Sequence, residues 1–228
     1  MEPIKITEPG FRVRRGISAD VERLVNLHYR VFDTNTHHLL LLGRPVLASA
    51  YHWYCESPNA FTLVAENHGG TIGCATVSVG SYYAFFRQHW LRVVAAFLGK
   101  PNRLFHPLLL QRLSAVFSPS RPASRKIHTN RSAYLGYLVV DAEQRGKGVG
   151  GALIWASVEN CRSRGWEQLV TCLHRPNVSA FSFYQRLGFQ RFPELDSGDL
   201  LGIRIQTVKV ALERNASEAL GVNGTVAI

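Results

Sequence analysis

The chain has 228 residues, of which 46% are apolar and 18% are charged, and it carries 26 Lys and Arg against 16 Asp and Glu. A chain this rich in apolar side chains can bury enough surface to offset the entropy lost on folding, which excludes general disorder. The net charge of +10 suggests a nucleic-acid partner, but no DNA or RNA recognition motif accompanies it. We expect one domain over residues 1–214 and a flexible tail over 215–228.

The positive charge is distributed unevenly along the chain. Residues 67–140 contain no Asp or Glu but hold nine Lys and Arg residues, so the rest of the chain is almost neutral. An acid-free basic stretch favours an anionic partner, either an anionic substrate or an anionic membrane surface.

The N-terminus and the cysteines indicate a compartment. The first residues lack the apolar core and cleavage site of a secretion signal, and no apolar run approaches the roughly 18 residues of a membrane span. The four cysteines form no C-x-x-C pair, so we expect reduced, buried thiols in a cytoplasmic protein. We expect no metal site, because His37 and His38 lack further ligands at a recognisable spacing.

The hydrophobic pattern of the first half predicts helices, strands and one hairpin. In chain order these are a strand over residues 11–14, a helix capped by Ser18 and ending at 31, a helix over 46–55, strands over 61–66 and 71–79, and helices over 84–98 and 104–117. The two strands are joined by Asn67-His-Gly-Gly, whose glycines accept the positive φ of a tight turn.

The second half alternates strands and helices. The predicted elements are a strand over residues 133–140, a helix over 148–164, a strand over 168–173, a helix capped by Asn177 and ending at 187, and a strand pair over 189–192 and 203–211. A strand–loop–helix order around a glycine-rich loop is typical of a ligand site.

The loop between the strand over 133–140 and the next helix has the chemistry of a phosphate cradle. Glycines at 146, 148, 150 and 151 let backbone N–H groups approach a ligand at the positive end of the helix dipole, and Arg145 and Lys147 add charge. A Walker loop is excluded, because Gly148 follows Lys147 where Ser or Thr is required.

This loop could also be a dinucleotide-binding loop or a turn that binds no ligand. The dinucleotide fingerprint G-x-G-x-x-G matches literally at residues 146–151, but five residues separate the strand from its first glycine. The next strand also lacks the acidic residue that holds a ribose at its end, so we regard this match as accidental. A glycine-rich turn without a ligand is the remaining alternative.

Two segments together resemble the GCN5-related N-acetyltransferase (GNAT) family. One is Arg145-x-x-Gly148-x-Gly150, and the other is the N-x-x-A-x-x-F-Y-x-x-x-G-F pattern at residues 177–189. The resemblance implies an α/β fold with a mixed, partly splayed central sheet flanked by helices. It places the cofactor-binding core at 133–190 and makes residues 82–131 a basic helical insert between the third and fourth strands.

The resemblance also implies acetyl-CoA as acyl donor and direct attack by a primary amine. The main chain of Leu138 and Val140 would hold the pantetheine arm, and the N–H of Val139 or Val140 would face the developing oxyanion. The amides expected around the pyrophosphate are those of Arg145, Gly146, Lys147, Gly148, Val149 and Gly150.

Two residues of the second segment have implied roles near the thioester. Asn177 would reach the cofactor arm, and Tyr184 would donate a proton to the departing thiolate. Each also has a purely structural interpretation, since Asn177 is a sufficient helix cap and Tyr184 fits an aromatic core stripe.

The residue that accepts the proton of the amine is less clearly indicated. Relatives that acetylate protein N-termini place a carboxylate five residues before the position of Asn177, where this chain has Cys172. His174 follows on the same strand face and is a candidate base. The other candidates are Glu66, Asp141 and Glu143.

The resemblance places the acceptor site between residues 33–45 and 194–202. We favour a small-molecule amine, such as a nucleotide- or lipid-linked amino sugar, with a protein N-terminal or side-chain amine as the alternative. A non-catalytic acetyl-CoA sensor and a membrane-associated binding module represent other classes of function. Peripheral membrane contact through the insert and a homodimer stay open, and no nucleic-acid partner is expected.

Overall fold

The computed structural model describes residues 6–8, 10–33, 38–79, 131–196 and 200–207, together with residues 85, 88, 89, 91 and 209. The described strands are β1 Ile6–Glu8, β2 Phe11–Arg15, β3 Ala60–Asn67, β4 Gly70–Val79, β5 Ser132–Val140, β6 Gln168–His174, β7 Gln190–Arg191 and β8 Leu200–Gln206. The helices are α1 Val21–Val31, α2 His38–Leu42, α3 Arg44–Glu56, α8 Val149–Ser163 and α9 Val178–Arg186. Short 3-10 turns lie at Ser18–Asp20, Ala142–Gln144 and Pro193–Leu195.

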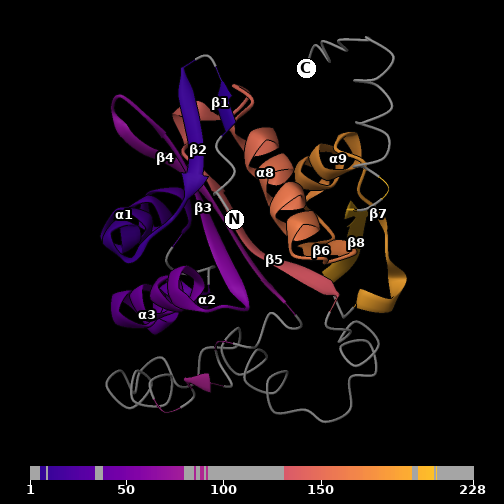
Figure 1. Ribbon diagram of the computed structural model, residues 1–228, viewed down its shortest axis with the longest axis horizontal. Coiled ribbons are helices and arrows are strands. Elements are labelled where there is room, and N and C mark those ends of the chain that lie inside the picture. The colour runs from indigo at the N-terminus through magenta and orange to yellow at the C-terminus, as the bar shows by residue number, and fades with distance from the viewer. Residues whose placement is uncertain are drawn as a thin grey trace.

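The described strands form one mixed sheet in the order β1-β2-β3-β4-β5-β6-β8-β7. Neighbouring strands are antiparallel except β5 and β6, which run parallel. Helices α1, α2 and α3 lie on one side of the sheet, and α8 and α9 lie on the other (Figure 1). This arrangement confirms the predicted α/β class and its helix-flanked mixed sheet.

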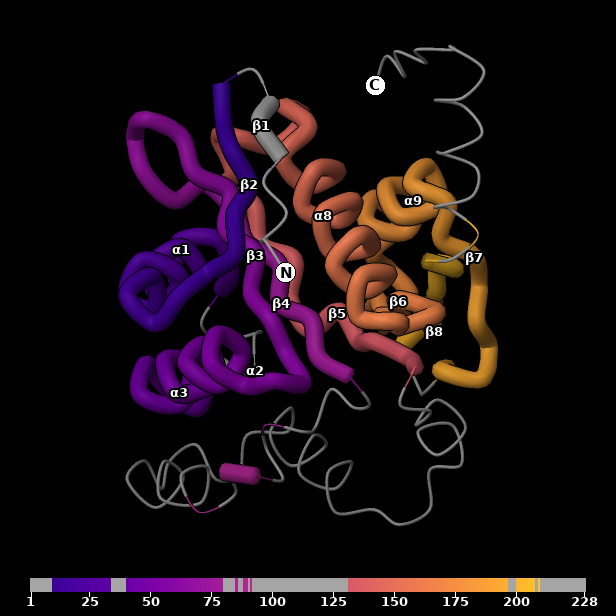
Figure 2. Tube along the Cα trace, in the orientation of Figure 1, coloured from indigo at the N-terminus to yellow at the C-terminus, as the bar shows by residue number. Residues whose placement is uncertain are grey.

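Each side of the sheet has its own apolar core. Leu153 and Ile154 of α8 pack with Phe61, Leu135 and Trp166 on one side, which we call the α8 core. Leu24, Leu47 and Tyr51 pack with Tyr137 and Val139 on the other, which we call the α1–α3 core. The chain passes from β5 through the glycine loop into α8, so the loop joins the sheet to the α8 layer (Figure 2).

Most predicted elements within the described residues are confirmed. The predicted hairpin is β3–β4, in which the side chain of Asn67 accepts a hydrogen bond from the Gly69 N–H and Gly70 has a φ of 114°. The helix predicted at 148–164 is α8, and Asn177 caps α9 by accepting the Ala180 N–H at 3.0 Å. Elements with strong local periodicity and caps are therefore formed as expected.

Some boundaries and caps differ from the prediction. Ser18 does not cap α1, because its hydroxyl donates to Glu56 at 2.6 Å and a 3-10 turn precedes the helix. Strand β8 begins at Leu200, three residues before the predicted start, because it pairs with the full length of β6. Strand β1 and helix α2 were not predicted.

The insert and the tail lie mainly outside the described residues. The helices predicted at 84–98 and 104–117, the tail over 215–228 and His37 belong to this part of the chain. At the start of the insert, Phe85 is 2% exposed and packs in the α1–α3 core beside Trp53. The ends of the connection meet, since Val79 of β4 pairs with Ala133 of β5.

The cysteines follow the expectation in part. All four are free, and three are buried, whereas Cys172 is half-buried. Burial raises the pKa of the Cys74 thiol to about 12, so this group is un-ionised at neutral pH. Among the residues with described structure, none of the helices has the length and apolar character needed to cross a bilayer.

Candidate active site

Strands β5 and β6 pair over a short distance and then separate. Their register covers residues 132–134 of β5 against 168–170 of β6. At the next position the Thr171 hydroxyl donates to the Leu135 carbonyl at 3.0 Å, and the described register contains no further pairing between these strands. From Tyr137 to Val140, β5 is therefore paired only with β4, and its other edge is free of β6.

The direction of the β5 main chain shows which groups face this free edge. The Tyr137 N–H points toward β4, where the Thr76 hydroxyl accepts it at 3.0 Å. The Asp141 N–H also points that way, to the Ile72 carbonyl at 2.9 Å. Because N–H groups alternate in direction along a strand, those of Leu138 and Val140 face the free edge.

This geometry separates the three strand residues implied by the resemblance. Leu138 and Val140 present N–H groups to the edge where the pantetheine arm is expected, and their side chains are half-buried against the α8 core. The Val139 N–H lies on the β4 side, and its side chain is fully buried in the α1–α3 core. Of the two expected oxyanion donors, Val140 and not Val139 therefore faces the free edge.

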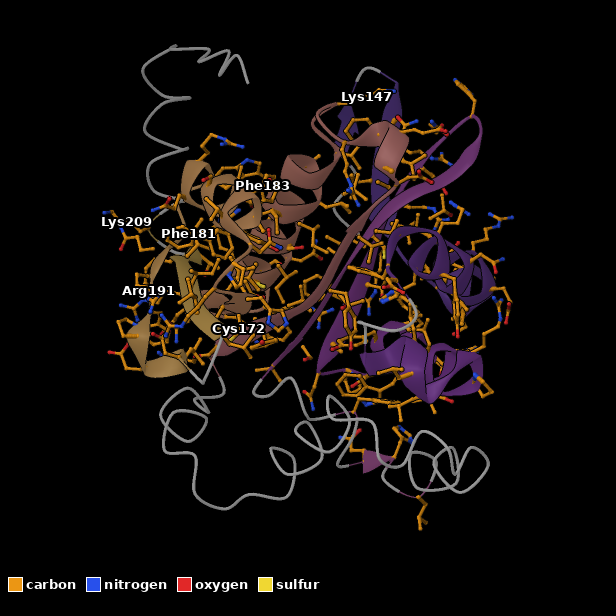
Figure 3. All side chains as sticks on the ribbon, turned by 180° about the vertical axis from the view of Figure 1, so that it is seen from behind. Lys147, Cys172, Phe181, Phe183, Arg191 and Lys209 are labelled. Carbon is orange, nitrogen blue, oxygen red and sulfur yellow. The ribbon has the colours of Figure 1, made fainter. Side chains whose placement is uncertain are left out.

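The glycine loop has open space where a phosphate is expected. Gly146 and Gly148 have φ values of 77° and 80°, and a Cβ placed on either would meet no atom within 4 Å. Gly148 is the N-cap of α8, so the first N–H groups of that helix, beginning at Val149, have no carbonyl partner within the helix. Exposed Arg145 and Lys147 flank this turn, and Figure 3 labels Lys147.

The donor set and the open space fit a pyrophosphate group. Backbone N–H groups at a helix N-terminus, together with two cations, are the groups that bind phosphate in proteins. The loop is held against α1, because Asp141 pairs with Arg30 at 3.0 Å and its side chain accepts the Glu143 N–H. These two contacts of the Asp141 side chain thus anchor the loop.

Helix α9 packs against the start of α8. A Cβ on Gly150 would lie 3.2 Å from the Phe183 ring, so glycine allows this close contact. Tyr184 is 6% exposed and packs edge-to-face on Phe183 and Phe189, with ring centroids 5.1 and 5.0 Å apart. Burial raises the pKa of Tyr184 well above its usual value, so its phenol stays protonated at neutral pH.

The candidate bases lie in different places. Glu66 is held by Arg12 at 2.6 Å and by Arg14 at 2.8 Å, and the hydrogen bond from Arg14 lowers its pKa. It lies on β3, separated from the free edge of β5 by β4. His174 is exposed at the end of β6, the strand that flanks this edge. Asp141 is engaged by Arg30, and Glu143 is exposed beside it.

The sequence did not predict the irregularity at Gly136. Leu135 packs in the α8 core, whereas Tyr137 and Val139 pack in the α1–α3 core, although all three stand at alternate positions. A bulge at Gly136 reverses the two faces of β5 at that point. An isolated glycine within a strand pattern was the available signal.

Comparison with known proteins shows which family the chain resembles. Residues 29–189 match the model of the acetyltransferase (GNAT) family. A segment of 67 residues is 36% identical to the N-alpha-acetyltransferase 30 of Schizosaccharomyces pombe, covering 29% of this chain and 45% of that protein. A segment of 53 residues is 42% identical to the mycothiol acetyltransferase of Thermobispora bispora, covering 23% of this chain and 18% of that protein.

These two matches span less than half the length of either curated relative. The fold resembles the PaiA N-acetyltransferase of Thermoplasma acidophilum, solved in complex with coenzyme A, with a TM-score of 0.56 and 13% identity over 86% of this chain and 98% of that one. With a family match over more than two thirds of its residues, the chain belongs to the GNAT acetyltransferase family, whose acyl donor is acetyl-CoA.

Proposed function

We propose that this protein is an acetyl-CoA-dependent N-acetyltransferase that moves an acetyl group directly to a primary amine. The observation that carries this proposal is the free edge of β5 next to the N-terminus of α8. An extended ligand arm can add to such an edge as a strand, while the helix terminus holds a phosphate at its end. Acetyl-CoA has both parts, and it supplies an acetyl group activated as a thioester.

The residues that would hold the donor come from three elements. The N–H groups of Leu138 and Val140 would bind along the free edge, with Val140 also placed to donate toward a carbonyl oxygen. The amides of residues 145–150 and the side chains of Arg145 and Lys147 would bind the pyrophosphate. Asn177 uses its side-chain oxygen to cap α9, which leaves its amide NH₂ group for the donor arm.

Tyr184 is the group we propose beside the sulfur. Its raised pKa keeps a proton on Oη, so it can donate a hydrogen bond to a departing thiolate. Full proton transfer is unfavourable, because the phenol is a weaker acid than a thiol of pKa about 8.5. We therefore assign Tyr184 a hydrogen-bonding role at the thiolate.

We propose His174 as the base, acting directly or through water. It is exposed and lies on the strand that flanks the free edge, whereas Glu66 is held by two arginines on β3. An arginine-paired carboxylate binds a proton weakly, which disfavours Glu66 as an acceptor at neutral pH.

The acceptor that we favour is a small-molecule amine with anionic character, such as a nucleotide- or lipid-linked amino sugar. The acid-free basic stretch over residues 67–140 supports an anionic acceptor. The similarity to an N-alpha-acetyltransferase supports a protein N-terminal amine as a second candidate. We place the reaction in the cytoplasm.

The test is an acetyl-CoA consumption screen over amino sugars, polyamines, amino acids and N-terminal peptides, combined with calorimetric titration of acetyl-CoA. We expect binding of acetyl-CoA and turnover with one amine class. Binding without turnover on any class would indicate an acetyl-CoA sensor. A chain that does not bind acetyl-CoA would refute the proposal.

A further inference from the structure

The bulge in β5 lies immediately before the groups proposed to hold the donor. Register moves from Val77 opposite Leu135 to Thr76 opposite Tyr137, which leaves Gly136 as an extra residue in β5. Two residues of β5 thus stand against one of β4, which is the definition of a bulge.

Thr76 supplies the acceptor for the main chain at this bulge. Its hydroxyl accepts the Tyr137 N–H at 3.0 Å, and both residues are buried, Thr76 with an exposed fraction of 0%. In a regular ladder a main-chain carbonyl is the acceptor at such a position. A side-chain hydroxyl of β4 therefore accepts the hydrogen bond that a main-chain carbonyl of β4 would accept in a regular ladder.

A second contact restricts the bulge from the α1–α3 side. A Cβ on Gly136 would lie 2.6 Å from the Tyr54 hydroxyl oxygen and 3.1 Å from the Thr76 hydroxyl oxygen. Tyr54 is itself 2% exposed. The bulge is therefore enclosed by Tyr54 and Thr76, and glycine is the residue that fits between them.

The bulge decides which N–H groups reach the free edge. If Gly136 were paired with β4 as in a regular ladder, the alternation along β5 would continue unchanged from Leu135. Every following N–H would then reverse direction, and those of Leu138 and Val140 would point toward β4. The groups facing the donor would be lost although no residue of the site had changed.

We propose that Thr76 is a positioning residue for acetyl transfer, because its hydroxyl holds the β5 bulge that turns the Leu138 and Val140 N–H groups to the free edge. The inference rests on the proposed function, in which those N–H groups bind acetyl-CoA. Thr76 acts through the Tyr137 main chain and needs no contact with either substrate.

The variants that test this role are Thr76→Val, Thr76→Ser and Thr62→Val. Thr76→Val keeps the shape of the side chain and removes the acceptor, whereas Thr76→Ser retains a hydroxyl. Thr62 is the matched control, since it stands directly opposite Thr76 on β3 and is equally buried. In the described part of the structure its hydroxyl holds no main-chain amide.

For Thr76→Val we expect the Kd of acetyl-CoA to rise about tenfold and kcat to fall about tenfold or more. The KM of the amine should stay within about threefold, because the amine does not bind β5 through these N–H groups. Thr76→Ser should restore Kd and kcat. Wild-type values in Thr76→Val, or an equal loss in Thr62→Val, would overturn the proposal.

Hydrogen exchange of the Tyr137 amide provides a readout that needs no turnover. In the wild-type protein it should exchange slowly, and in Thr76→Val at least about tenfold faster. Fast exchange in the wild type would overturn the inference even if Thr76→Val did not fold. If the wild type acetylated no amine, the proposed function would fail, while exchange and acetyl-CoA titration would still decide the role of Thr76.

Discussion

Replacing Gly148 by alanine separates its structural role from its binding role, because the chain contains a matched control. Gly148 and Gly165 stand at opposite ends of α8, with φ values of 80° and 71°. Both are exposed, and a Cβ on either would meet no atom within 4 Å. The two substitutions thus impose the same backbone strain without a steric clash.

The expected loss of stability is similar for the two variants. An alanine in the left-handed region costs about 1–2 kcal/mol, partly offset by about 0.4–1 kcal/mol from the reduced entropy of the unfolded chain. The net loss in the free energy of unfolding is therefore about 1 kcal/mol for Gly148→Ala and for Gly165→Ala. Urea denaturation measures this quantity.

Only Gly148→Ala should weaken binding of acetyl-CoA. The methyl group of the alanine would occupy the space at the N-terminus of α8 where a pyrophosphate is expected. We expect the loss of one charge-assisted hydrogen bond to the pyrophosphate, which costs about 1.5–3 kcal/mol of binding free energy. The Kd of acetyl-CoA should rise about 10- to 100-fold in calorimetric titration, whereas Gly165→Ala should keep the wild-type Kd. An equal Kd in both variants would refute the assignment of this loop.

Two further predictions concern Tyr184 and Asp20. Tyr184→Phe keeps the ring packing on Phe183 and Phe189, so the urea midpoint should not change. Because the hydroxyl is lost, kcat should fall about 10- to 100-fold. Undiminished turnover would exclude the role at the thiolate. The Arg14 guanidinium donates to both carboxylate oxygens of Asp20, at 2.7 and 2.8 Å, and these hydrogen bonds lower the pKa of Asp20. The ionised Asp20 carboxylate therefore contributes fully to the free energy of unfolding above about pH 4. This contribution is lost as the pH falls through the lowered pKa. In Asp20→Asn, the free energy of unfolding should therefore fall less steeply with decreasing pH below about pH 4 than in the wild type. The control Glu22→Gln, at an exposed ion pair with Arg44, should keep the wild-type slope. The same acid slope in the wild type and both variants would contradict the stabilising role of ionised Asp20.

The sequence predicted the elements whose causes are local. The helix α8 and the β3–β4 hairpin depend on periodicity, glycine and caps that lie within the segments themselves. The glycine loop was recognised for the same reason, since its residues are contiguous and their spacing is set by one turn. Local information therefore predicted the glycine turn at the start of α8, which is the proposed cofactor part of the candidate site.

The features that were not predicted depend on residues far apart in the chain. The bulge at Gly136 is held by Thr76 and Tyr54, which are 60 and 82 positions earlier. The Ser18 hydroxyl binds Glu56 instead of capping α1. Strand β8 begins at Leu200 because it pairs with β6 over the full length of that strand. Pairing across the sheet overrides local preference at these positions.

The pairing of Val79 with Ala133 closes the connection over residues 80–132, which holds the nine Lys and Arg residues of the basic stretch. Its two ends are already side by side in the sheet, so the connection between them is topologically equivalent to a hairpin turn. Making such a connection ten times longer costs only about 2 kcal/mol in loop-closure entropy. Most of the net charge of the protein thus resides in a connection whose length can change at a small cost in loop-closure entropy.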